Sequence, residues 1–378
     1  MRLQFTEEQE LLRRRVREFA AGSVASAVAD MEEKDAFPRE LLKAMGQEGL
    51  MGLSIPKEYR GAGADIASYI IAIEEIAKVS AAVGVILSVH LSVASLPIVH
   101  HGTKEQKSRF LPKLATGELL GAFALTESHA GSDAASIRTS AIRSGDEYIL
   151  NGSKMFITSA GEAGVYIVFA VVKSEGSIDG ITAFIVEKNT PGLRVGKKEK
   201  KMGLHGSNTC ELIFENMRVP AAQRLGQEGQ GFMIAKSALT GGRIGIGAQA
   251  LGIAKAALAE AERWEIERQS RARPRTPLRD PSLIELAAQV EAAHLLVYRA
   301  AYLYQNGLPC KKEASMAKLF ASDTAMTVTS RVLQRLGLHG LQDEHPVERY
   351  FRDAKVTQIY EGTNEIHRIV ISNELLKR

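Results

Sequence analysis

The stretch that decides the fold reads Tyr-Ile-Val-Phe-Ala-Val-Val at residues 166–172, and Ile-Thr-Ala-Phe-Ile-Val follows at 181–186. Both runs are short, apolar and rich in β-branched and aromatic residues, which is typical of buried strands. Shorter runs of this kind occur at 148–150 and 210–214, separated by turn sequences such as Ser-Gly-Asp at 144–146, Asn-Gly at 151–152 and Pro-Gly at 191–192. This spacing predicts an antiparallel sandwich or barrel over residues 121–230.

On both sides of this segment the pattern is helical. Thr6 and Gln9 form a capping-box sequence, and apolar residues follow at helical spacing. Pro38 and Thr103 mark further helix starts, and an alanine-rich face leads to Trp264 after residue 231. The order predicts an α+β multidomain protein, with an N-terminal helical domain at 1–120, the β domain at 121–230 and a C-terminal helical domain at 231–378.

Length and composition are those of an ordinary globular protein. The 378 residues suggest two to three domains, and 45% hydrophobic with 24% charged residues excludes intrinsic disorder. The net charge of +4 is too even to indicate a nucleic-acid partner. Cys210 and Cys310 cannot form a disulfide framework, and we expect a reducing compartment. With no signal or transit sequence recognised, we expect a cytoplasmic protein, or a mitochondrial-matrix one if the chain is a processed eukaryotic form.

Residues 79–103 contain no Asp, Glu, Lys or Arg and are long enough to span a bilayer. Four serines, His90 and Pro97 interrupt the stretch, so we interpret it as the central helix of a helical bundle and expect no membrane span.

Several other motifs are better explained by structure than by chemistry. Gly-Ile-Gly-Ala-Gln-Ala at 245–250 resembles a dinucleotide fingerprint, but it lies within a helical run, where helix packing explains it better. The acidic and histidine residues of 339–348 match no standard ligand spacing, so we predict no metal site. The basic run 197–201 is interpreted as a solvated loop.

Three separated segments remain as candidates for a functional site. Residues 125–133 (Leu-Thr-Glu-Ser-His-Ala-Gly-Ser-Asp) offer hydroxyl and backbone N–H groups to a planar heterocycle or a diphosphate, or are simply a surface turn. In residues 151–158, Phe156 and Thr158 lie two apart and so face one side of a strand, unless the ring belongs to the core.

The third segment is 352–366. Its apolar residues carry Glu361 to a helix end, Gly362 breaks that helix, and Thr363 can cap the next one. Desolvation among apolar groups would raise the pKa of Glu361 and make it a usable general base. The alternative is a purely structural acid.

Four ordered motifs together resemble the signatures of the acyl-CoA dehydrogenases over essentially the whole chain. They are Leu-Thr-Glu-x-x-Ala-Gly-Ser-Asp at 125–133, Asn-Gly-x-Lys-x-Phe-Ile-Thr at 151–158, Lys-Met-Gly-x-x-Gly-Ser at 201–207, and Arg-Asp-Ala-Lys to Ile-Tyr-Glu-Gly-Thr at 352–363. The resemblance implies a central β-barrel-like domain, a C-terminal four-helix bundle, and FAD between them.

The resemblance also implies roles for individual residues. Glu361 would be the catalytic base, since relatives that place the base before the arginine matching Arg243 have an acid where this chain has Gly242. The implied FAD-binding residues are Phe123, Leu125, Thr126, Ser132, Phe156, Ile157, Thr158, Arg268, Gln334, Gly337, Thr363 and Glu365. The implied substrate-binding residues are Ser132, Thr240, Arg243, Tyr360 and Gly362.

The implied reaction is α,β-dehydrogenation of an acyl-CoA. Glu361 would remove the weakly acidic α-proton while donors hold the thioester carbonyl, and hydride would pass from the β-carbon to flavin N5. The resemblance further implies an electron-transfer flavoprotein as electron acceptor and a homotetramer.

Residues 83–90 and 242–246 resemble short-chain, butyryl-type members, so we expect a short straight acyl group, with a short branched one as the alternative. Three further functions compete with this one. They are a carrier-protein-linked dehydrogenase, a flavin oxidase, and a non-catalytic binding protein that uses its basic segments on nucleic acid.

The chain departs from the family pattern at two places. After Arg268 the usual Phe-Gly pair, which holds the FAD diphosphate of a neighbouring subunit, is replaced by an arginine-rich segment that is two residues shorter. After Gln334, Leu338 stands where a second glycine is usual. We expect Arg271, Arg273 or Arg275 to replace the lost contacts by pairing with phosphate.

Overall fold

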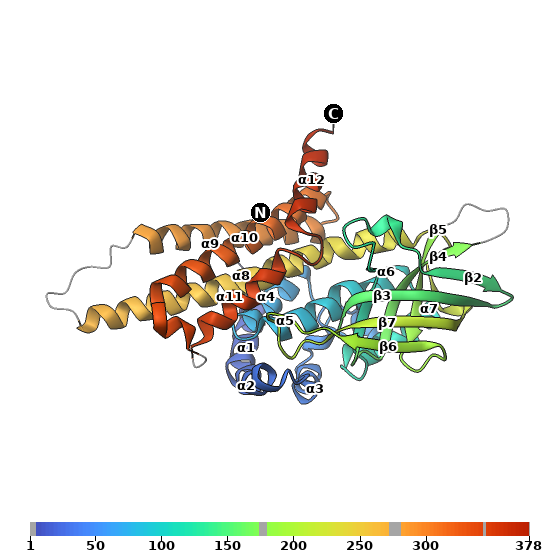
Figure 1. The fold of residues 1–378 in the computed structure, drawn as a ribbon, viewed down its shortest axis with the longest axis horizontal. Helices are drawn as coiled ribbons and strands as arrows, with labels where there is room; N and C mark the ends of the chain where they lie inside the picture. The colour runs from blue at the N-terminus through green and yellow to red at the C-terminus, as the bar shows by residue number, and fades with distance from the viewer. Residues whose placement is uncertain (1–4, 174–179, 272–280, 343–344, 378) are drawn as a thin grey trace.

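A computed structural model describes residues 5–173, 180–271, 281–342 and 345–377. The N-terminal part is helical, as predicted (Figure 1). Its helices are α1 (Glu7–Phe19), α2 (Ala25–Lys34), α3 (Arg39–Gln47), α4 (Ile66–Ala77), α5 (Ala81–Ser88), α6 (Leu96–His101) and α7 (Lys104–Ala115), with π-helical turns at Ala20–Val24 and Val89–Ser95. The predicted capping box forms at Thr6, the helix start predicted at Thr103 also has a capping box, and Pro38 precedes α3.

The central part is an eight-stranded sheet. Its strands are β1 (Gly121–Ala124), β2 (Ser140–Ser144), β3 (Glu147–Thr158), β4 (Val165–Lys173), β5 (Gly180–Glu187), β6 (Leu193–Lys198), β7 (Thr209–Pro220) and β8 (Arg224–Leu225). They run in the order β6-β7-β3-β2-β4-β5-β8, with β1 paired to β4. All four strand runs predicted from the sequence are strands.

The prediction of an antiparallel barrel or sandwich is wrong in two respects. The sheet is open, because β6 and β8 are its two ends and no ladder joins them within the described residues. It is also mixed, because β1 and β2 each pair with β4 in parallel. Turn residues identify local hairpins such as β2–β3, whose ladder ends at Ser144 and Glu147, but they carry no information on pairings across longer connections.

The C-terminal part is a helical bundle. It contains α8 (Gly231–Arg271), α9 (Pro281–Gln305), α10 (Lys311–Leu336), α11 (Pro346–Thr357) and α12 (Asn364–Leu375). Figure 1 shows α8 running from the sheet to the far end of the bundle, while α12 projects from the body of the molecule. The run at 245–250 that resembles a dinucleotide fingerprint lies inside α8, as the helical interpretation predicted.

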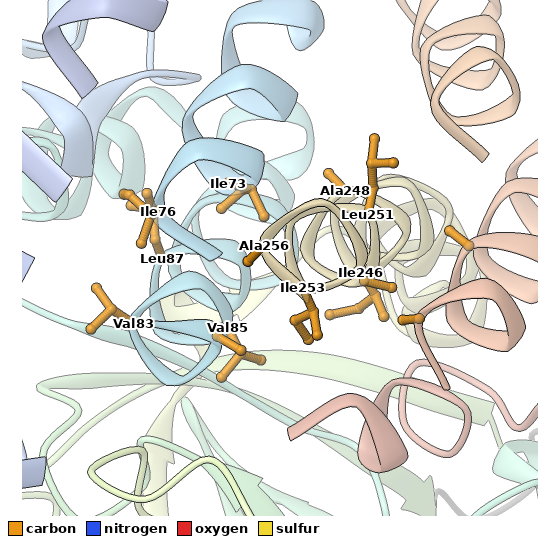
Figure 2. Close-up of a cluster of buried hydrophobic side chains, with 14 of the residues drawn as sticks. Ile73, Ile76, Val83, Val85, Leu87, Ile246, Ala248, Leu251, Ile253 and Ala256 are labelled. Atoms are coloured by element: carbon orange, nitrogen blue, oxygen red, sulfur yellow. The ribbon is translucent and has the colours of Figure 1, made fainter. Parts of the chain in front are cut away.

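The two helical parts share one hydrophobic core, although the chain places the sheet between them. Figure 2 shows Ile73 of α4 and Val85 of α5 beside Ile246 and Ile253 of α8. All four side chains are buried. The proposed boundaries at residues 120 and 230 therefore separate segments of sequence, while the packing joins the first and last segments.

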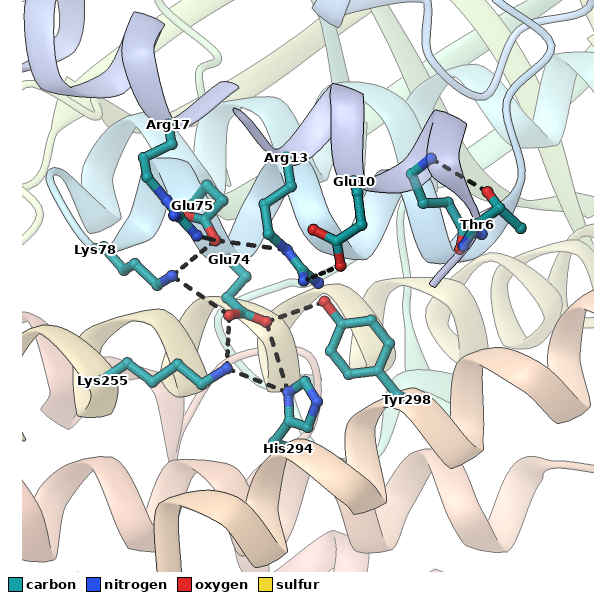
Figure 3. A network of polar contacts seen from close by, with 11 residues as sticks. Thr6, Glu10, Arg13, Arg17, Glu74, Glu75, Lys78, Lys255, His294 and Tyr298 are labelled. Carbon is teal, nitrogen blue, oxygen red and sulfur yellow. Dashed lines mark hydrogen bonds and ion pairs between the residues drawn. The ribbon is translucent and has the colours of Figure 1, made fainter. Parts of the chain in front are cut away.

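A buried polar cluster also joins the helical parts (Figure 3). Glu74 of α4 accepts hydrogen bonds from Lys255 of α8 at 2.7 Å and from Tyr298 of α9 at 3.0 Å. Its neighbour Glu75 pairs with Arg17 of α1 at 3.1 Å. Both carboxylates are only 2% exposed, so these partners offset the cost of burying charge.

The uncharged stretch at residues 79–103 is mostly helical and buried, as predicted. Residues 81–101 form a helix long and apolar enough to cross a membrane by composition, as do residues 231–270. In the first, 94% of the most apolar window is buried inside the protein. His90 is fully buried there, with Nε2 3.1 Å from the carbonyls of Met51 and Leu114. The absence of a membrane span stays a prediction.

Candidate active site

A cavity of about 680 Å³ lies where the sheet, the central helix of residues 81–101, the first turns of α8 and the α11–α12 junction meet. Its walls contain most of the residues predicted for a functional site: Phe123, Leu125, Thr126, Ser132, Phe156, Ile157, Thr158, Thr240, Arg243, Tyr360, Glu361 and Gly362. Segments more than 200 residues apart in sequence are thus brought to one place.

Phe156 reaches this cavity because β3 is bulged. The pairing of β3 with β7 shifts register between Lys154 and Ile157, and Phe156 has φ of +58°. A bulge re-aims side chains that strict alternation would place elsewhere. Phe156, Ile157 and Thr158 all line the cavity, whereas strand alternation predicted only Phe156 and Thr158 on one side and Ile157 was implied by the family resemblance alone. The ring of Phe156 is 60% exposed, a large apolar surface facing open space.

The loop 125–133 is held in place by a buried lysine that the sequence reasoning did not single out. Lys154 is fully buried, and its Nζ donates to the Leu125 carbonyl at 2.9 Å and to Glu127 Oε1 at 2.7 Å. Glu127 also accepts the backbone N–H groups of Arg138 and Thr139. Because the backbone N–H of Met155 donates to the Thr126 carbonyl, the two predicted motifs form one unit.

Glu361 lies in a turn, not at a helix end. The predicted helix stops earlier, since α11 ends at Thr357 and Glu361 has φ of +54°. Thr363 caps α12 through the N–H of Ile366, as predicted. The side chain therefore points into the cavity from a backbone conformation that is uncommon for a residue other than glycine.

Gly242 of α8 makes room for this carboxylate. A Cβ atom at position 242 would lie 2.6 Å from Oε2 of Glu361 and 3.0 Å from Oε1. The space that a side chain at position 242 would fill is thus occupied by the carboxylate of Glu361. The role of Glu361 as the base stays a prediction.

The environment of Glu361 suits a base. Desolvation raises its pKa to about 7, opposed by the positive charges of Arg243 and Lys318. Its Oε2 is buried without a hydrogen-bond partner among the described residues, and the same holds for Nε of Arg243. A carboxylate with an unpaired oxygen, titrating near neutrality, can accept a proton from a group bound in the cavity.

Behind the Glu361 turn lies a buried polar group that the sequence analysis missed. Lys318 of α10 bonds the carbonyl of Gly362 and the side chain of Asn364, and His367 is fully buried beside Gly362. A charged residue in the alanine-rich face of α10 was the available signal, since lysine is almost never fully buried without a partner.

Five predicted residues are absent from the cavity lining: Arg268, Gln334, Gly337, Thr363 and Glu365. Arg268 pairs with Glu265 near the end of α8, and Glu265 in turn pairs with Arg335 of α10 at 2.6 Å, so Gln334 and Gly337 lie at this same far end of the bundle. Thr363 caps α12, and Glu365 is an exposed residue of its first turn, so both lie beside Gly362 of the cavity wall. Of the three arginines expected to bind phosphate, Arg273 and Arg275, with the side chain of Arg271, lie outside the described residues.

The remaining two motifs contact each other. Asp353 is buried and accepts the backbone N–H of Leu204 at 2.6 Å, while Arg352 donates to the Met202 carbonyl. Burial raises the pKa of Asp353 to about 6. These motifs therefore attach the sheet to α11, just before the Glu361 turn.

No group of three His, Cys, Asp or Glu side chains in the described residues could hold a metal ion. Asp343 and Glu344, which the sequence analysis weighed as ligands, lie outside those residues. Cys210 and Cys310 are both buried free thiols.

Three protein-family models match the chain in order. They are the N-terminal domain of acyl-CoA dehydrogenase at residues 6–118, the middle domain at 122–217 and the C-terminal domain at 229–376. This chain belongs to the acyl-CoA dehydrogenase family. The family was correctly inferred from its four motifs, and the chain is accordingly an oxidoreductase of this kind.

Relatives in the family match over their full length. An acyl-CoA dehydrogenase of Bacillus subtilis is 56% identical over 98% of both chains. A short-chain specific acyl-CoA dehydrogenase of Clostridium acetobutylicum is 46% identical over 100% of both. The solved butyryl-CoA dehydrogenase of Megasphaera elsdenii is 44% identical over 100% of both chains, with a TM-score of 0.94.

Two further solved members name a partner and a cofactor. A chain in the structure described as the electron transferring flavoprotein of Acidaminococcus fermentans is 45% identical over 100% of both chains, with a TM-score of 0.95. An acyl-CoA dehydrogenase of Bacillus anthracis, complexed with FAD, is 32% identical over 99% of this chain and 67% of its own, with a TM-score of 0.90.

The cavity fits an isoalloxazine ring. Its lining includes the exposed side chain of Phe156 and the hydroxyl-bearing residues Thr126, Ser132 and Thr158. Apolar residues of the central helix and of α8 also line the cavity, together with polar and charged side chains such as Arg243 and Glu361. An aromatic face beside hydrogen-bonding groups is what a flat heterocycle needs to be stacked and oriented.

Proposed function

We propose that this protein catalyses the FAD-dependent α,β-dehydrogenation of a short-chain acyl-CoA, with Glu361 as the base that removes the α-proton. The observation that carries the proposal is the carboxylate of Glu361, which lies in the cavity wall over Gly242 with one oxygen unpaired among the described residues. FAD, when bound, would accept the hydride from the β-carbon.

The chain's own residues account for the proton transfer. A thioester α-proton is only weakly acidic, so removal needs a base that is deprotonated near neutral pH and correctly placed. Glu361 has a pKa of about 7, and Arg243 and Lys318 stabilise its charged form. Gly362 and Tyr360, which flank the base, also line the cavity, and we assign their backbone to the orientation of the thioester.

The cavity has apolar side chains against which an acyl group can pack. Val85, Val89 and Val93 of the central helix face the cavity together with Leu239 and Ile246 of α8. Burial of a short alkyl chain against them contributes roughly 0.8 kcal/mol for each CH₂ group. The short-chain assignment also draws on the full-length similarity to the clostridial short-chain enzyme and the butyryl-CoA dehydrogenase.

The anionic end of CoA has cations near the cavity. Lys236 and Lys311 both contribute to the lining, and both side chains are solvent-exposed. Electron-transfer flavoprotein is the proposed acceptor of the electrons, supported by the similarity to the A. fermentans structure. A homotetramer is part of the same proposal.

The test is a visible spectrum of the purified protein, recorded without oxygen before and after addition of butyryl-CoA. We expect a flavin spectrum that bleaches, and Glu361→Gln should retain the flavin but not bleach. Full bleaching by the Gln variant would refute Glu361 as the base.

Chain length and acceptor are decided by separate assays. Turnover of C4, C6, C8 and isobutyryl thioesters with an artificial acceptor should be fastest at C4, and a maximum at C8 or longer rejects the short-chain assignment. Rapid oxygen consumption by the reduced protein would instead identify an oxidase.

A further inference from the structure

Lys318 is a lysine whose burial is not explained by an ion pair. Its side chain on α10 is fully buried, yet within the described part of the chain its Nζ donates to two neutral acceptors, the Gly362 carbonyl at 2.7 Å and Asn364 Oδ1 at 2.9 Å. Removing an ammonium group from water is costly unless nearby charge compensates. A methionine of similar length would pack here without that cost.

Both acceptors belong to the segment that carries the base. Gly362 directly follows Glu361, whose φ is +54°, and Gly362 itself has φ of +97°. Gly362 adopts this conformation freely, but Glu361 is a non-glycine residue in the left-handed region, and neighbouring contacts must hold it there. The Lys318 bond to the carbonyl of Gly362 is such a contact, and it joins the turn to α10.

Asn364 completes the clamp. Its side-chain amide donates to Ser322 Oγ at 3.0 Å and to Asp323 Oδ1 at 2.8 Å, and its Oδ1 accepts from Lys318. The first residue of α12 is thus bonded to three polar positions of α10. Movement of Lys318 would release the turn and the start of α12 together.

We propose that Lys318 is a positioning residue for the base: it fixes the Glu361–Gly362 turn through the Gly362 carbonyl, and its charge favours the carboxylate form of Glu361. The inference rests on the proposed role of Glu361. It concerns a residue that touches neither cavity nor substrate, since Lys318 is absent from the cavity lining.

Charged and titratable groups on every element packed around Glu361 influence its pKa, directly or through Lys318. Arg243 of α8 and Lys318 of α10 stabilise the carboxylate. Asp323 and Glu365 act on Lys318, and Tyr69, Tyr360 and His367 also lie close enough to interact with members of the group. Burial lowers the pKa of Lys318, and Glu361 opposes that shift. Loss of the ammonium therefore moves the pKa of Glu361 upward.

The experiment compares Lys318→Met with Lys318→Arg in the FAD-loaded protein. For Lys318→Met we expect the acidic limb of the kcat/KM profile with butyryl-CoA to move to higher pH by about one unit, the shift that an opposite charge nearby typically causes. At pH 7, kcat should fall by about tenfold while KM changes little, because the lost contact acts on the transition state. Lys318→Arg should restore the position of the limb.

Thr329→Val is the matched control. Thr329 is a fully buried polar residue on the same helix, and its hydroxyl donates to the carbonyls of Ala325 and Met326, both within that helix. We expect an unchanged limb. Melting temperatures and flavin content of all variants separate a local effect from misfolding.

A double-mutant cycle with Glu361→Gln distinguishes the two levels of the argument. If Lys318 acts through Glu361, Lys318→Met should change the residual rate of the Glu361→Gln protein by less than about twofold. An unmoved limb in Lys318→Met, with Glu361→Gln inactive, would overturn the role of Lys318 alone. Retained turnover in Glu361→Gln would overturn the proposed function as well. Should Lys318→Met not fold, Asn364→Ala tests the clamp, with a smaller kcat loss expected.

Discussion

At the scale of single residues, the site depends on the absence of a side chain at Gly242, which leaves room for the carboxylate of Glu361. The carboxylate of Glu361 occupies the position where a side chain on residue 242 would begin, 2.6 Å from its Oε2. Real Cβ atoms do not approach an oxygen so closely, so the two side chains exclude each other. The sequence made Glu361 a candidate because Gly362 and Thr363 mark the boundary between two helices directly after it. Position 242 supported this choice, because it holds a glycine and so cannot supply an acid.

Gly242→Ala should therefore displace the base. We expect kcat with butyryl-CoA to fall by about 100-fold, since a displacement of about 1 Å at a catalytic group costs that much. Gly241→Ala is the control, because a Cβ there would meet only Tyr304 among the described residues, at 3.5 Å. Equal effects of the two substitutions on kcat would show that helix packing, and not the carboxylate, is being disturbed.

Glu361 should also destabilise the protein as pH rises. Its pKa is about 7 in the folded protein and near 4.5 in an unfolded chain, so folding favours the protonated form. Stability from this group is fully present below pH 4.5 and is lost as pH rises through 7. The free energy of unfolding of Glu361→Gln, relative to that of the wild type, should therefore rise by on the order of 2 kcal/mol between pH 5 and pH 8.

The measurement is the melting temperature of both proteins across that pH range. Glu40→Gln, which removes an exposed carboxyl group on α3, is the control and should show a constant difference. A difference between Glu361→Gln and wild type that stays flat from pH 5 to pH 8 would contradict the raised pKa.

At the scale of elements, the sequence predicts what is local and misses what is not. The capped helices and all four strand runs form as predicted, because caps, turns and periodicity act over a few residues. The β3 bulge at Phe156 and the parallel pairing of β2 with β4 were not predictable, since both depend on partners far along the chain. The same holds for Lys154, whose partners lie 27 and 29 residues away.

Lys154→Met should release the loop 125–133 from β3. Breaking a buried pair by removal of one partner leaves Glu127 charged and uncompensated, which costs about 3–5 kcal/mol. We expect a lower unfolding midpoint in urea and weaker FAD retention, measured as the ratio of flavin to protein absorbance. The double variant Lys154→Met, Glu127→Gln should recover part of the stability. An unchanged unfolding midpoint and flavin content in Lys154→Met would show that the loop 125–133 keeps its position without Lys154.

At the scale of the whole molecule, the predicted FAD contacts fall into two groups that one chain cannot bring together. Arg243 lines the cavity, and Arg268 lies 25 residues further along the same helix, a distance of roughly 37 Å at 1.5 Å per residue. No dinucleotide-sized cofactor spans that length. The family resemblance already implied a neighbouring subunit for contacts made after Arg268, and the length of the continuous helix α8 explains why one chain cannot make both sets of contacts.

If both groups bind FAD, they must come from different copies of the chain. The helix α12 projects from the body (Figure 1), and apolar residues on it and just after it are exposed, with Ile369 at 55% and the following Leu376 at 76% exposure. Such residues on a projecting element are typical of an interface between subunits. We therefore expect Ile369→Asp combined with Leu376→Asp to lower the mass of the assembly in analytical ultracentrifugation and to release FAD at the same time.

Arg268→Ala provides the decisive comparison. It should weaken FAD binding without changing the assembly, because its side chain is 63% exposed at the end of α8 and leaves the apolar surface of α12 intact. A dissociated variant that keeps its full complement of flavin would show that one chain suffices for the cofactor. In that case Arg268, Gln334 and Gly337 would have only a structural role, as the pairing of Arg268 with Glu265 already allows.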